Sequence, residues 1–376
     1  MKKEEFKVTP WDVKGVVDYE KLIKEFGVSK IDTKLLERIK KNTGELHFML
    51  RRGVFFAHRD MNWLLDEYEK GNKFFLYTGR GPSGKVHLGH LFPWLFTKWL
   101  QDKFDVELLF QMTDDEKFLF KEKLSLEETN SLAYENALDV IAMGFDPKKT
   151  KIIVDTDQAG LMYKEAIKVS KKITFSMVKS SFGFNDSNNI GEIFYTSMQA
   201  VPAFLPSVMK KREIPCLIPH AVDQDPHFRL TRDILPKLGH YKPASIQCLF
   251  LPPLAGVTGK MGTSDEEMGT IFTTDTPEEV KKKINKYAFS GGRDTIEEHR
   301  KLGGNPDIDV SFQYLKMFFE SDDKKLEQIE KDYRGGKMLT GELKAILIEK
   351  INTFLKEHQR KRELAKKEID KFLLKA

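Results

Sequence analysis

The pattern of hydrophobic and polar positions around residue 80 predicts a strand, a turn and a helix in that order. Residues 74–78 are rich in aromatic and aliphatic side chains, as short buried strands are. The next segment cannot continue a strand, because it contains Gly79, Gly81, Pro82, Ser83 and Gly84. Apolar residues then recur at helical spacing, at Leu88, Leu91, Phe92, Leu95 and Phe96. This layout is typical of a nucleotide site, where helix N-terminal N–H groups face an anion and glycines let a phosphate approach.

Similar apolar runs alternate with helical patterns further along the chain. Strands are predicted over 106–112, 151–154, 216–222 and 245–251, and a helix over 126–143 that ends at Gly144. Strands that alternate with helices at these intervals predict an α/β fold with a Rossmann-like parallel sheet. Polar residues at the carboxyl ends of such strands are the expected ligand contacts.

The organisation that these patterns predict has three parts, which 376 residues are enough to build. They are an N-terminal helical extension with a small separate segment over 1–70, a Rossmann-like catalytic domain over 71–275 with a helical insertion over 155–215, and an all-α C-terminal domain over 276–376. In the first part, Asp60 is expected to cap a helix whose Leu64, Leu65 and Tyr68 face inward. In the last part, helices are predicted over 322–333, 340–356 and 359–373.

Composition excludes a membrane-spanning protein and adds little about partners. No apolar run has the length needed to cross a bilayer, and the N-terminus lacks the apolar region of a signal peptide. A net charge of +5 is compatible with nucleic-acid binding but does not predict it alone. The two cysteines, Cys216 and Cys248, are too few for a zinc site or a disulfide framework. We expect both to pack in strands, and the protein to be cytoplasmic.

The turn after the first strand has two chemical interpretations. Gly79, Gly84 and Lys85 match most of a Walker A loop, but Val86 stands where a Ser or Thr must reach magnesium. Pro82 also removes a backbone donor from the middle of that loop. The favoured interpretation is the segment 87–90, which reads His-Leu-Gly-His. Its two imidazoles, three positions apart at a helix start, lie on one helix face and can point at a phosphate.

A second motif lies far downstream, at Lys260-Met261-Gly262-Thr263-Ser264, after Gly256 and Gly259. A lysine flanked by glycines and hydroxyl residues can move over a polyphosphate and neutralise it as a point charge.

The order of the two motifs resembles that of class I aminoacyl-tRNA synthetases, with HxGH near the start of an α/β domain and K-M-x-x-S near its end. Further segments narrow the resemblance: Tyr77-Thr78-Gly79-Arg80-Gly81-Pro82-Ser83, Gln111-Met112-Thr113-Asp114-Asp115-Glu116-Lys117, Asp223-Gln224-Asp225-Pro226 and Ala288-Phe289-Ser290-Gly291-Gly292-Arg293-Asp294. From about Val8 to the C-terminus, the chain resembles tryptophanyl-tRNA synthetases of the archaeal and eukaryotic kind.

This resemblance implies an activity and a set of roles. The activity is activation of L-tryptophan with ATP and Mg²⁺, followed by transfer to the 3′-terminal ribose of tRNA(Trp). The catalytic residues are His87, His90 and Lys260. The ATP-binding residues are Gly79, Gly81, Ser83, Gly89, Asp223, Met261 and Ser264. The tryptophan-binding residues are Tyr77, Gln111, Glu116, Gln199 and Gln224. No metal ligand is expected among the side chains.

The resemblance also assigns roles to the three parts of the chain. It implies a lid over the ATP side of the site near 8–13, homodimer contacts and part of the amino-acid pocket in the insertion, and anticodon binding in the C-terminal helices. One departure from the family pattern is Gly262-Thr263, where Ser-Ala or Ser-Lys is usual. Gly262 is expected to affect the motion of this loop rather than the activity.

Three other functions stay open at this point. Tyrosine activation by the same fold would use an acceptor–donor pair for a phenol, and Gln111 suits an indole better. A small-molecule nucleotidyltransferase also uses HxGH but does not need the basic C-terminal helices. An RNA-binding module with a relic site is disfavoured because His87, His90 and Lys260 are all present.

Overall fold

The structure, a computed structural model, describes residues 7–8, 13–14, 19–262 and 269–375. Its centre is a seven-stranded sheet with the strand order β3-β4-β9-β8-β5-β6-β7. The strands of this sheet are β3 (Ser29–Lys30), β4 (Phe55–Arg59), β5 (Phe75–Arg80), β6 (Glu107–Met112), β7 (Thr150–Val154), β8 (Cys216–Ala221) and β9 (Ala244–Cys248). The strands from β9 across to β7 all pair in parallel, which confirms the predicted Rossmann-like α/β fold.

The order of the strands reverses beside β5. The chain runs outward from β5 through β6 to β7, and then returns to β8 and β9 on the other side of β5. Open α/β sheets bind ligands in the crevice beyond the carboxyl ends of the strands at such a reversal. The segments that follow Arg80 in β5 and Ala221 in β8 therefore border the expected site.

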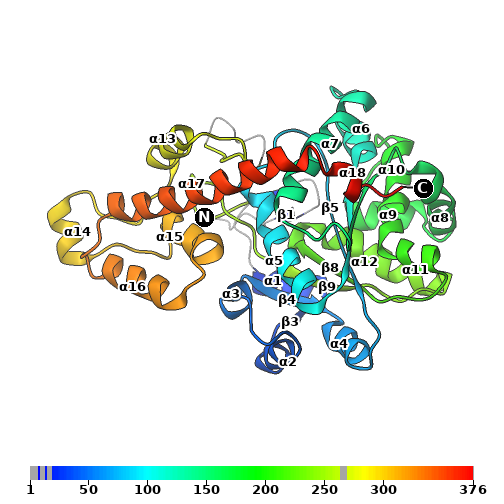
Figure 1. Ribbon diagram of the computed structural model, residues 1–376, viewed down its shortest axis with the longest axis horizontal. Coiled ribbons are helices and arrows are strands. Elements are labelled where there is room, and N and C mark those ends of the chain that lie inside the picture. The colour runs from blue at the N-terminus through cyan, green and yellow to red at the C-terminus, as the bar shows by residue number, and fades with distance from the viewer. Residues whose placement is uncertain (1–6, 9–12, 15–18, 263–268, 376) are drawn as a thin grey trace.

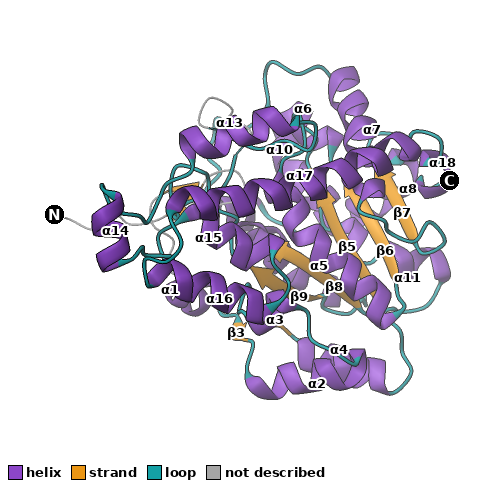
Figure 2. Ribbon diagram, turned by 60° about the vertical axis from the view of Figure 1, so that its left-hand side comes forward, coloured by secondary structure: helices purple, strands orange, loops and turns teal. Residues whose placement is uncertain are grey.

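Helices lie on both faces of this sheet (Figure 1, Figure 2). In chain order, the helices of the described residues before β8 are α1 (Tyr19–Phe26), α2 (Thr33–Thr43), α3 (Phe48–Arg51), α4 (Met61–Glu69), α5 (Leu88–Phe104), α6 (Asp114–Phe120), α7 (Leu126–Ala142), α8 (Ala159–Ser170), α9 (Phe175–Phe182), α10 (Ile190–Met198), η1 (Val201–Ala203) and α11 (Leu205–Lys210). After β8 they are η2 (Val222–Gln224), α12 (Asp225–Ile234), η3 (Leu235–Leu238), α13 (Pro277–Tyr287), α14 (Ile296–Leu302), α15 (Val310–Tyr314), the π-helix η5 (Leu315–Phe319), α16 (Asp323–Arg334), α17 (Thr340–Ala365) and α18 (Ile369–Phe372).

Alternate residues of the strands pack into two hydrophobic layers, as the two-residue period of a strand requires. In β5, Leu76 packs with the layer that contains residues of α5, α7 and the C-terminal helices. Phe75 and Tyr77 pack with the layer that contains the helices of the predicted insertion. Cys216 and Cys248 are buried strand residues, one in each layer, as predicted. Within the described residues, no helix is both long and apolar enough to span a membrane.

The N-terminal part contributes strands that the sequence analysis assigned to helices. β4 pairs antiparallel with β9, and β3 pairs antiparallel with β4, so this part extends the sheet. The residues 55–59 are too few, and their pairing with β9 too distant in sequence, for a local pattern to reveal the strand. Leu64 and Leu65 of α4 are buried as predicted, but Asp60 makes no side-chain capping hydrogen bond. The proposed lid falls partly on 9–12, outside the described residues; its flanks, β1 (Lys7–Val8) and β2 (Val13–Lys14), pair antiparallel.

The C-terminal part is helical, and its longest helix crosses to the catalytic sheet (Figure 2). Two helices were predicted over 340–356 and 359–373, but α17 runs unbroken from Thr340 to Ala365. Neither Gly nor Pro occurs between those predicted helices, so nothing stops the first one. Beyond α18, the Leu374 N–H donates to the Ile152 carbonyl of β7 at 2.8 Å, which returns the chain to the edge of the sheet.

Candidate active site

The two predicted histidines lie in contact at the start of α5. The residues after β5 form the glycine turn, and His87 immediately precedes the helix. The centroids of the His87 and His90 rings are 3.5 Å apart. His87 is only 2% exposed, and its Nδ1 has no hydrogen-bond partner. A buried ring nitrogen without a partner is a group that a ligand can satisfy.

Arg80, the last residue of β5, fixes the second histidine. Its Nη1 lies 2.6 Å from His90 Nε2, and its Nε donates to Asn136 Oδ1 of α7 at 2.7 Å. A guanidinium can only donate, so His90 Nε2 faces one donor, and the His87 N–H is a second donor, 3.2 Å from His90 Nδ1. Burial, with Arg80 and Lys260 nearby, holds the pKa of both histidines well below 6.5. Both imidazoles are therefore neutral at physiological pH, and the unpartnered Nδ1 of His87 is the ring nitrogen left for a ligand.

Gly89 lets the downstream motif approach these rings. A Cβ added there would lie 3.1 Å from His87 Cε1 and 3.5 Å from Met261 Cβ. Met261 is buried, and its N–H donates to the Leu251 carbonyl at 3.1 Å. The K-M-x-x-S segment thus packs against the HxGH segment.

Lys260 reaches the same crevice from the other side of β5. Its Nζ forms an ion pair with Asp223 Oδ2 and lies 5.7 Å from the centroid of the Phe250 ring. Asp223 is 1% exposed, and its Oδ1 has no hydrogen-bond partner. The side chain of Lys260 is 40% exposed, so the ammonium is accessible to an anion as well as to Asp223.

A second set of polar side chains is centred on Tyr77 of β5 and Gln111 of β6. The Tyr77 hydroxyl donates to Gln111 Oε1 at 2.5 Å, and Gln199 Nε2 donates to the Tyr77 oxygen at 2.5 Å. Gln199 Nε2 is also 3.2 Å from Gln111 Oε1, and the Tyr195 hydroxyl donates to Gln199 Oε1. Burial raises the pKa of Tyr77 well above 10, so its hydroxyl keeps its proton. Three of the residues predicted to bind tryptophan therefore meet in one buried network.

Glu116 is buried at the start of α6, close to the glycine turn. It accepts from Thr113 Oγ1 at 2.7 Å and pairs with Lys117 Nζ at 2.8 Å. Burial raises the pKa of Glu116, but Lys117, the hydrogen bond from Thr113 and the nearby His227 together more than offset this, and the pKa is lowered overall. A Cβ added at Gly81 would lie 2.7 Å from Glu116 Oε2 and 2.1 Å from Lys117 Cε. Gly81 thus leaves room for this ion pair.

Four predicted site residues remain, and the structure describes three of them. Gly79 faces the neighbouring strand, since an added Cβ would lie 2.8 Å from the Gln111 carbonyl oxygen. Ser83 is half-buried in the glycine turn, and Gln224 is half-buried at the end of η2. Ser264 lies outside the described residues. The roles assigned to all these residues stay predictions.

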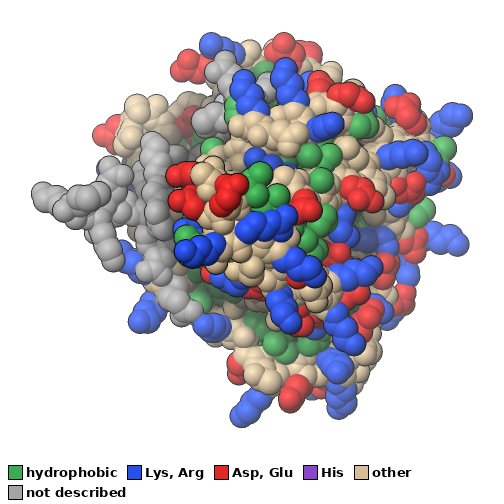
Figure 3. All heavy atoms as spheres, turned by 90° about the vertical axis from the view of Figure 1, so that its left-hand side faces the viewer, with side chains coloured by type: hydrophobic (Ala, Val, Ile, Leu, Met, Phe, Trp, Pro, Cys, Tyr) green, Lys and Arg blue, Asp and Glu red, His purple; other side chains and the backbone are tan. Residues whose placement is uncertain are grey.

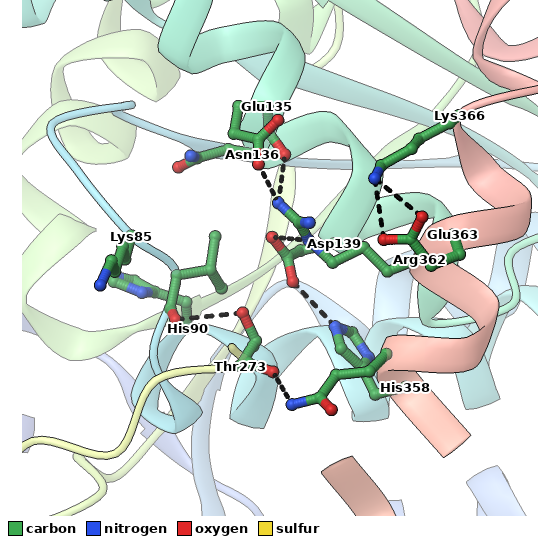
Figure 4. Close-up of polar contacts among 12 residues, drawn as sticks. Lys85, His90, Glu135, Asn136, Asp139, Thr273, His358, Arg362, Glu363 and Lys366 are labelled. Atoms are coloured by element: carbon green, nitrogen blue, oxygen red, sulfur yellow. Dashed lines mark hydrogen bonds and ion pairs between the residues drawn. The ribbon is translucent and has the colours of Figure 1, made fainter. Parts of the chain in front are cut away.

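A buried polar cluster connects α7 to α17 behind the histidines (Figure 4). Asp139 of α7 accepts from His358 Nε2 at 2.9 Å and from Arg362 Nε at 3.1 Å. Gln359 donates to the Thr273 carbonyl at 2.8 Å, and the Thr273 N–H donates to the Val86 carbonyl at 2.9 Å. The helix α17 is therefore linked through Thr273 to the segment that leads into His87.

Four residues that complete this geometry were not predicted from the sequence, namely Arg80, Asn136, Tyr195 and Asp155, whose Oδ2 accepts from Gln111 Nε2 at 2.7 Å. Arg80 stands within a motif that was singled out for its glycines, and a cation beside two histidines was a usable signal. Asn136 and Tyr195 are single polar residues within helices, which carry no local mark of function.

A parallel sheet with a reversal of strand order, with an HxGH pair beside a K-M-x-x-S lysine, is the arrangement expected of a class I synthetase. The family of tRNA synthetases class I (W and Y) matches residues 69–356 of the chain. The chain therefore belongs to this family.

Comparison with individual relatives shows to which group within this family the chain belongs. The Tryptophan–tRNA ligase of Sulfurisphaera tokodaii is 56% identical over 370 residues, which cover 98% of this chain and 95% of that protein. The cytoplasmic Tryptophan–tRNA ligase of Homo sapiens is 53% identical over 382 residues, which cover 98% of this chain and 80% of that protein. The solved tryptophanyl-tRNA synthetase of Giardia lamblia is 42% identical with a TM-score of 0.89, over 95% of this chain and 96% of that chain. Within its family the chain thus belongs with the tryptophanyl-tRNA synthetases, and the predicted resemblance is confirmed.

Proposed function

We propose that the chain activates L-tryptophan with ATP to tryptophanyl-adenylate and transfers tryptophan to the 3′-terminal ribose of tRNA(Trp). The observation that carries the proposal is the convergence of His87, His90 and Lys260 on one crevice, beside the buried Tyr77–Gln111 network. The relatives named Tryptophan–tRNA ligase support the same function.

The first step needs alignment and charge neutralisation rather than a covalent enzyme intermediate. A tryptophan carboxylate oxygen attacks the α-phosphorus, and the bond from that phosphorus to the pyrophosphate oxygen breaks. The neutral imidazole of His87 donates to a phosphate oxygen, and His90 does so after a phosphate displaces one of the two donors that face its ring. Lys260 exchanges its contact with Asp223 for the polyphosphate, whose negative charge it neutralises. Mg²⁺ supplies further neutralisation of the phosphates when it is bound.

The nucleotide lies against the glycine turn and the start of α5 in this proposal. Gly79, Gly81, Ser83 and Gly89 border it on one side, and Asp223, Met261 and Ser264 on the other. The unpartnered Asp223 Oδ1 is then available to a ribose hydroxyl or an amide. In the second step the terminal ribose hydroxyl of tRNA attacks the carbonyl carbon, and AMP leaves.

Selection of tryptophan rests on an acceptor for the indole N–H in an apolar slot. The Tyr77 oxygen and Gln111 Oε1 supply that acceptor, while Glu116 holds the ammonium, and Gln199 and Gln224 contact the ammonium or carboxylate. A site built to satisfy such a polar group can reject an analogue that lacks it by roughly 10⁴-fold. A tyrosine site would instead need a pair suited to a phenol.

ATP–pyrophosphate exchange measured with each of the twenty amino acids tests the proposal. We expect exchange that depends on tryptophan. Exchange that depends only on tyrosine would reassign the substrate, and exchange with no amino acid dependence would leave a nucleotidyltransferase. Charging of tRNA(Trp) then separates a synthetase from an enzyme that stops at the adenylate.

The other parts of the chain receive roles in the same proposal. The C-terminal helices bind the anticodon. On the face of the molecule shown in Figure 3, Lys and Arg side chains lie among Asp and Glu side chains. The insertion forms a homodimer, in keeping with Tyr163 and Ile190, which are 54% and 84% exposed. Sedimentation of the wild type and of Ile190→Asp checks this: the wild type is expected to be dimeric and the variant monomeric. The 8–13 segment acts as the lid, and the protein works in the cytoplasm.

A further inference from the structure

The side-chain amide of Gln111 can present either an acceptor or a donor to the tryptophan pocket. An amide has an oxygen that accepts and an NH₂ group that donates, and its neighbours decide which one faces which way. The residue behind Gln111 is Asp155, which directly follows β7. Gln111 Nε2 donates to Asp155 Oδ2 at 2.7 Å. This contact turns the NH₂ group away from the pocket and leaves Oε1 toward Tyr77.

The direction of one hydrogen bond fixes the direction of the next. Because Gln111 Oε1 faces Tyr77, the Tyr77 hydroxyl donates to it at 2.5 Å. A hydroxyl has a single proton, so once that proton is committed the Tyr77 oxygen can only accept. Gln199 Nε2 donates to that oxygen at 2.5 Å. Both oxygens that can meet the indole N–H are thus set as acceptors by the contact to Asp155.

The reverse arrangement would favour a different ligand. If Gln111 turned its NH₂ group toward Tyr77, the Tyr77 oxygen would accept from it and its hydroxyl would be free to donate outward. Such a pocket prefers a ligand with an acceptor, or none, at the indole nitrogen position. The carboxyl group behind Gln111 is therefore what makes the pocket specific for an N–H donor.

The surroundings of Asp155 fit this role. Asp155 is 0% exposed and its Oδ1 has no hydrogen-bond partner, so Gln111 is the partner that satisfies Oδ2. Burial and the neighbouring Asp115 raise the pKa of Asp155, and the pKa of Asp115 rises to about 7. One proton within the pair removes the repulsion between them, while Oδ2 still accepts from Gln111.

We propose that Asp155 is a positioning residue for substrate selection, which fixes the amide of Gln111 so that the pocket offers acceptors to the indole N–H. The inference rests on the proposed function, since it concerns the tryptophan site. It adds a residue that does not touch the substrate.

The test compares two substrates in ATP–pyrophosphate exchange: tryptophan, and β-(3-benzothienyl)alanine, in which sulfur replaces the N–H. The measured quantity is the ratio of kcat/KM for the two. In Asp155→Ala we expect this ratio to fall by about 10- to 100-fold, because the amide is free to turn. In Asp155→Asn the side-chain oxygen still accepts from Gln111, and the ratio is expected to stay within about 3-fold of the wild type.

Asp114→Ala is the matched control. Asp114 is also 0% exposed at the same edge of the sheet, but it accepts from the Thr156 N–H at 3.1 Å and from Asn130 Nδ2 at 3.2 Å. Removing it is expected to lower stability and to leave the substrate ratio unchanged. A folded Asp155→Ala with the wild-type ratio overturns the inference, and so does an equal loss in Asp155→Asn.

A reciprocal exchange keeps the inference testable if Asp155→Ala does not fold. Gln111→Glu places two carboxyl groups against each other, and kcat/KM for tryptophan is expected to fall by at least about 10-fold. Adding Asp155→Asn supplies an NH₂ donor to the new carboxylate, and kcat/KM for tryptophan is expected to recover. Absence of recovery contradicts the inference. Wild-type protein without tryptophan-dependent exchange overturns the proposed function instead, so the two failures are distinct.

Discussion

At the scale of single residues, the ammonium of Lys260 is the charge on which the proposed chemistry depends most. It is held over the Phe250 ring and paired with the buried Asp223, yet its side chain is 40% exposed. A partly exposed ammonium can exchange one anionic partner for another. The proposed chemistry uses this exchange to bring positive charge to the polyphosphate.

Lys260→Ala is therefore expected to lower the rate of tryptophan-dependent ATP–pyrophosphate exchange by on the order of 10²-fold or more, while tRNA binding is retained. Lys283→Ala is the matched control, because Lys283 also pairs with a buried aspartate, Asp275, and lies 4.9 Å from the centroid of the Phe272 ring. The rate of ATP–pyrophosphate exchange in this control should stay near that of the wild type. Equal rates in the wild type and Lys260→Ala would remove this lysine from the mechanism.

Gly79 allows β5 and β6 to approach next to the tryptophan pocket. In Gly79→Ala the new Cβ meets the Gln111 carbonyl oxygen at 2.8 Å, and backbone cannot give way as a side-chain end can. We expect a several-fold rise in KM for tryptophan, larger than the rise in KM for ATP. Gly160→Ala is the control, since nothing lies within 4 Å of its added Cβ. An unchanged KM for tryptophan would show that β6 does not transmit the displacement to Gln111.

The residues with a motif around them could be predicted from the sequence, and those without one could not. His87, His90 and Lys260 stand in short patterns whose residue types already name a phosphate site. Asp155 and Asn136 matter because of what they contact across the sheet, at Gln111 and Arg80. No local pattern encodes those contacts, because each depends on how distant segments pack.

At the scale of elements, α17 is the helix that ties the C-terminal part to the catalytic sheet. Its His358 and Arg362 both bond to Asp139, whose side chain is 2% exposed. Removing one partner of a buried ionic cluster leaves charge without compensation, which costs more than losing a surface pair.

Asp139→Ala is thus expected to lower the free energy of unfolding by about 3–5 kcal/mol, measured by urea denaturation. The comparison is Asp102→Ala on α5, where the carboxylate pairs with Lys98 but is 54% exposed. That variant should change the free energy of unfolding by less than about 1 kcal/mol. Similar losses in both variants would mean that the α7–α17 cluster contributes no more than a surface ion pair.

Element boundaries followed local signals wherever such signals existed. α7 begins at a capping box of Ser125 and Glu128 and ends just before Gly144, close to the predicted 126–143. The strand β4 was not predicted because its pairing with β9 joins segments almost two hundred residues apart, and the two-residue edge strand β3 pairs only with β4. The helix boundary predicted near 357 was wrong because no breaker stands there.

At the scale of the whole molecule, buried histidines make stability depend on pH. Burial lowers the pKa of six of them: His47 and His227 to about 4, and His58, His87, His90 and His220 below 6.5. When the pKa of a histidine is lower in the folded state, the unfolded state binds more protons below 6.5, so stability falls as pH falls. Asp115 and Asp155, with raised pKa values, act in the opposite direction over much of the same range.

Since six groups oppose two, we expect the free energy of unfolding to decrease from pH 7 to pH 5, as measured by urea denaturation at steps between. His47→Gln removes one of the six groups and should make the decrease less steep. A free energy of unfolding that stays constant or rises as pH falls would contradict the assignment of these histidines as neutral and buried.

The central claim is that two imidazoles and a distant lysine act on one triphosphate beside an indole slot. A crystal structure of the protein with tryptophan and a non-hydrolysable ATP analogue measures this directly. We predict phosphate oxygens within hydrogen-bond distance of His87, His90 and Lys260, and the indole N–H on the Tyr77 oxygen or Gln111 Oε1. A triphosphate that contacts none of the three, or an indole bound away from Tyr77 and Gln111, would contradict the account.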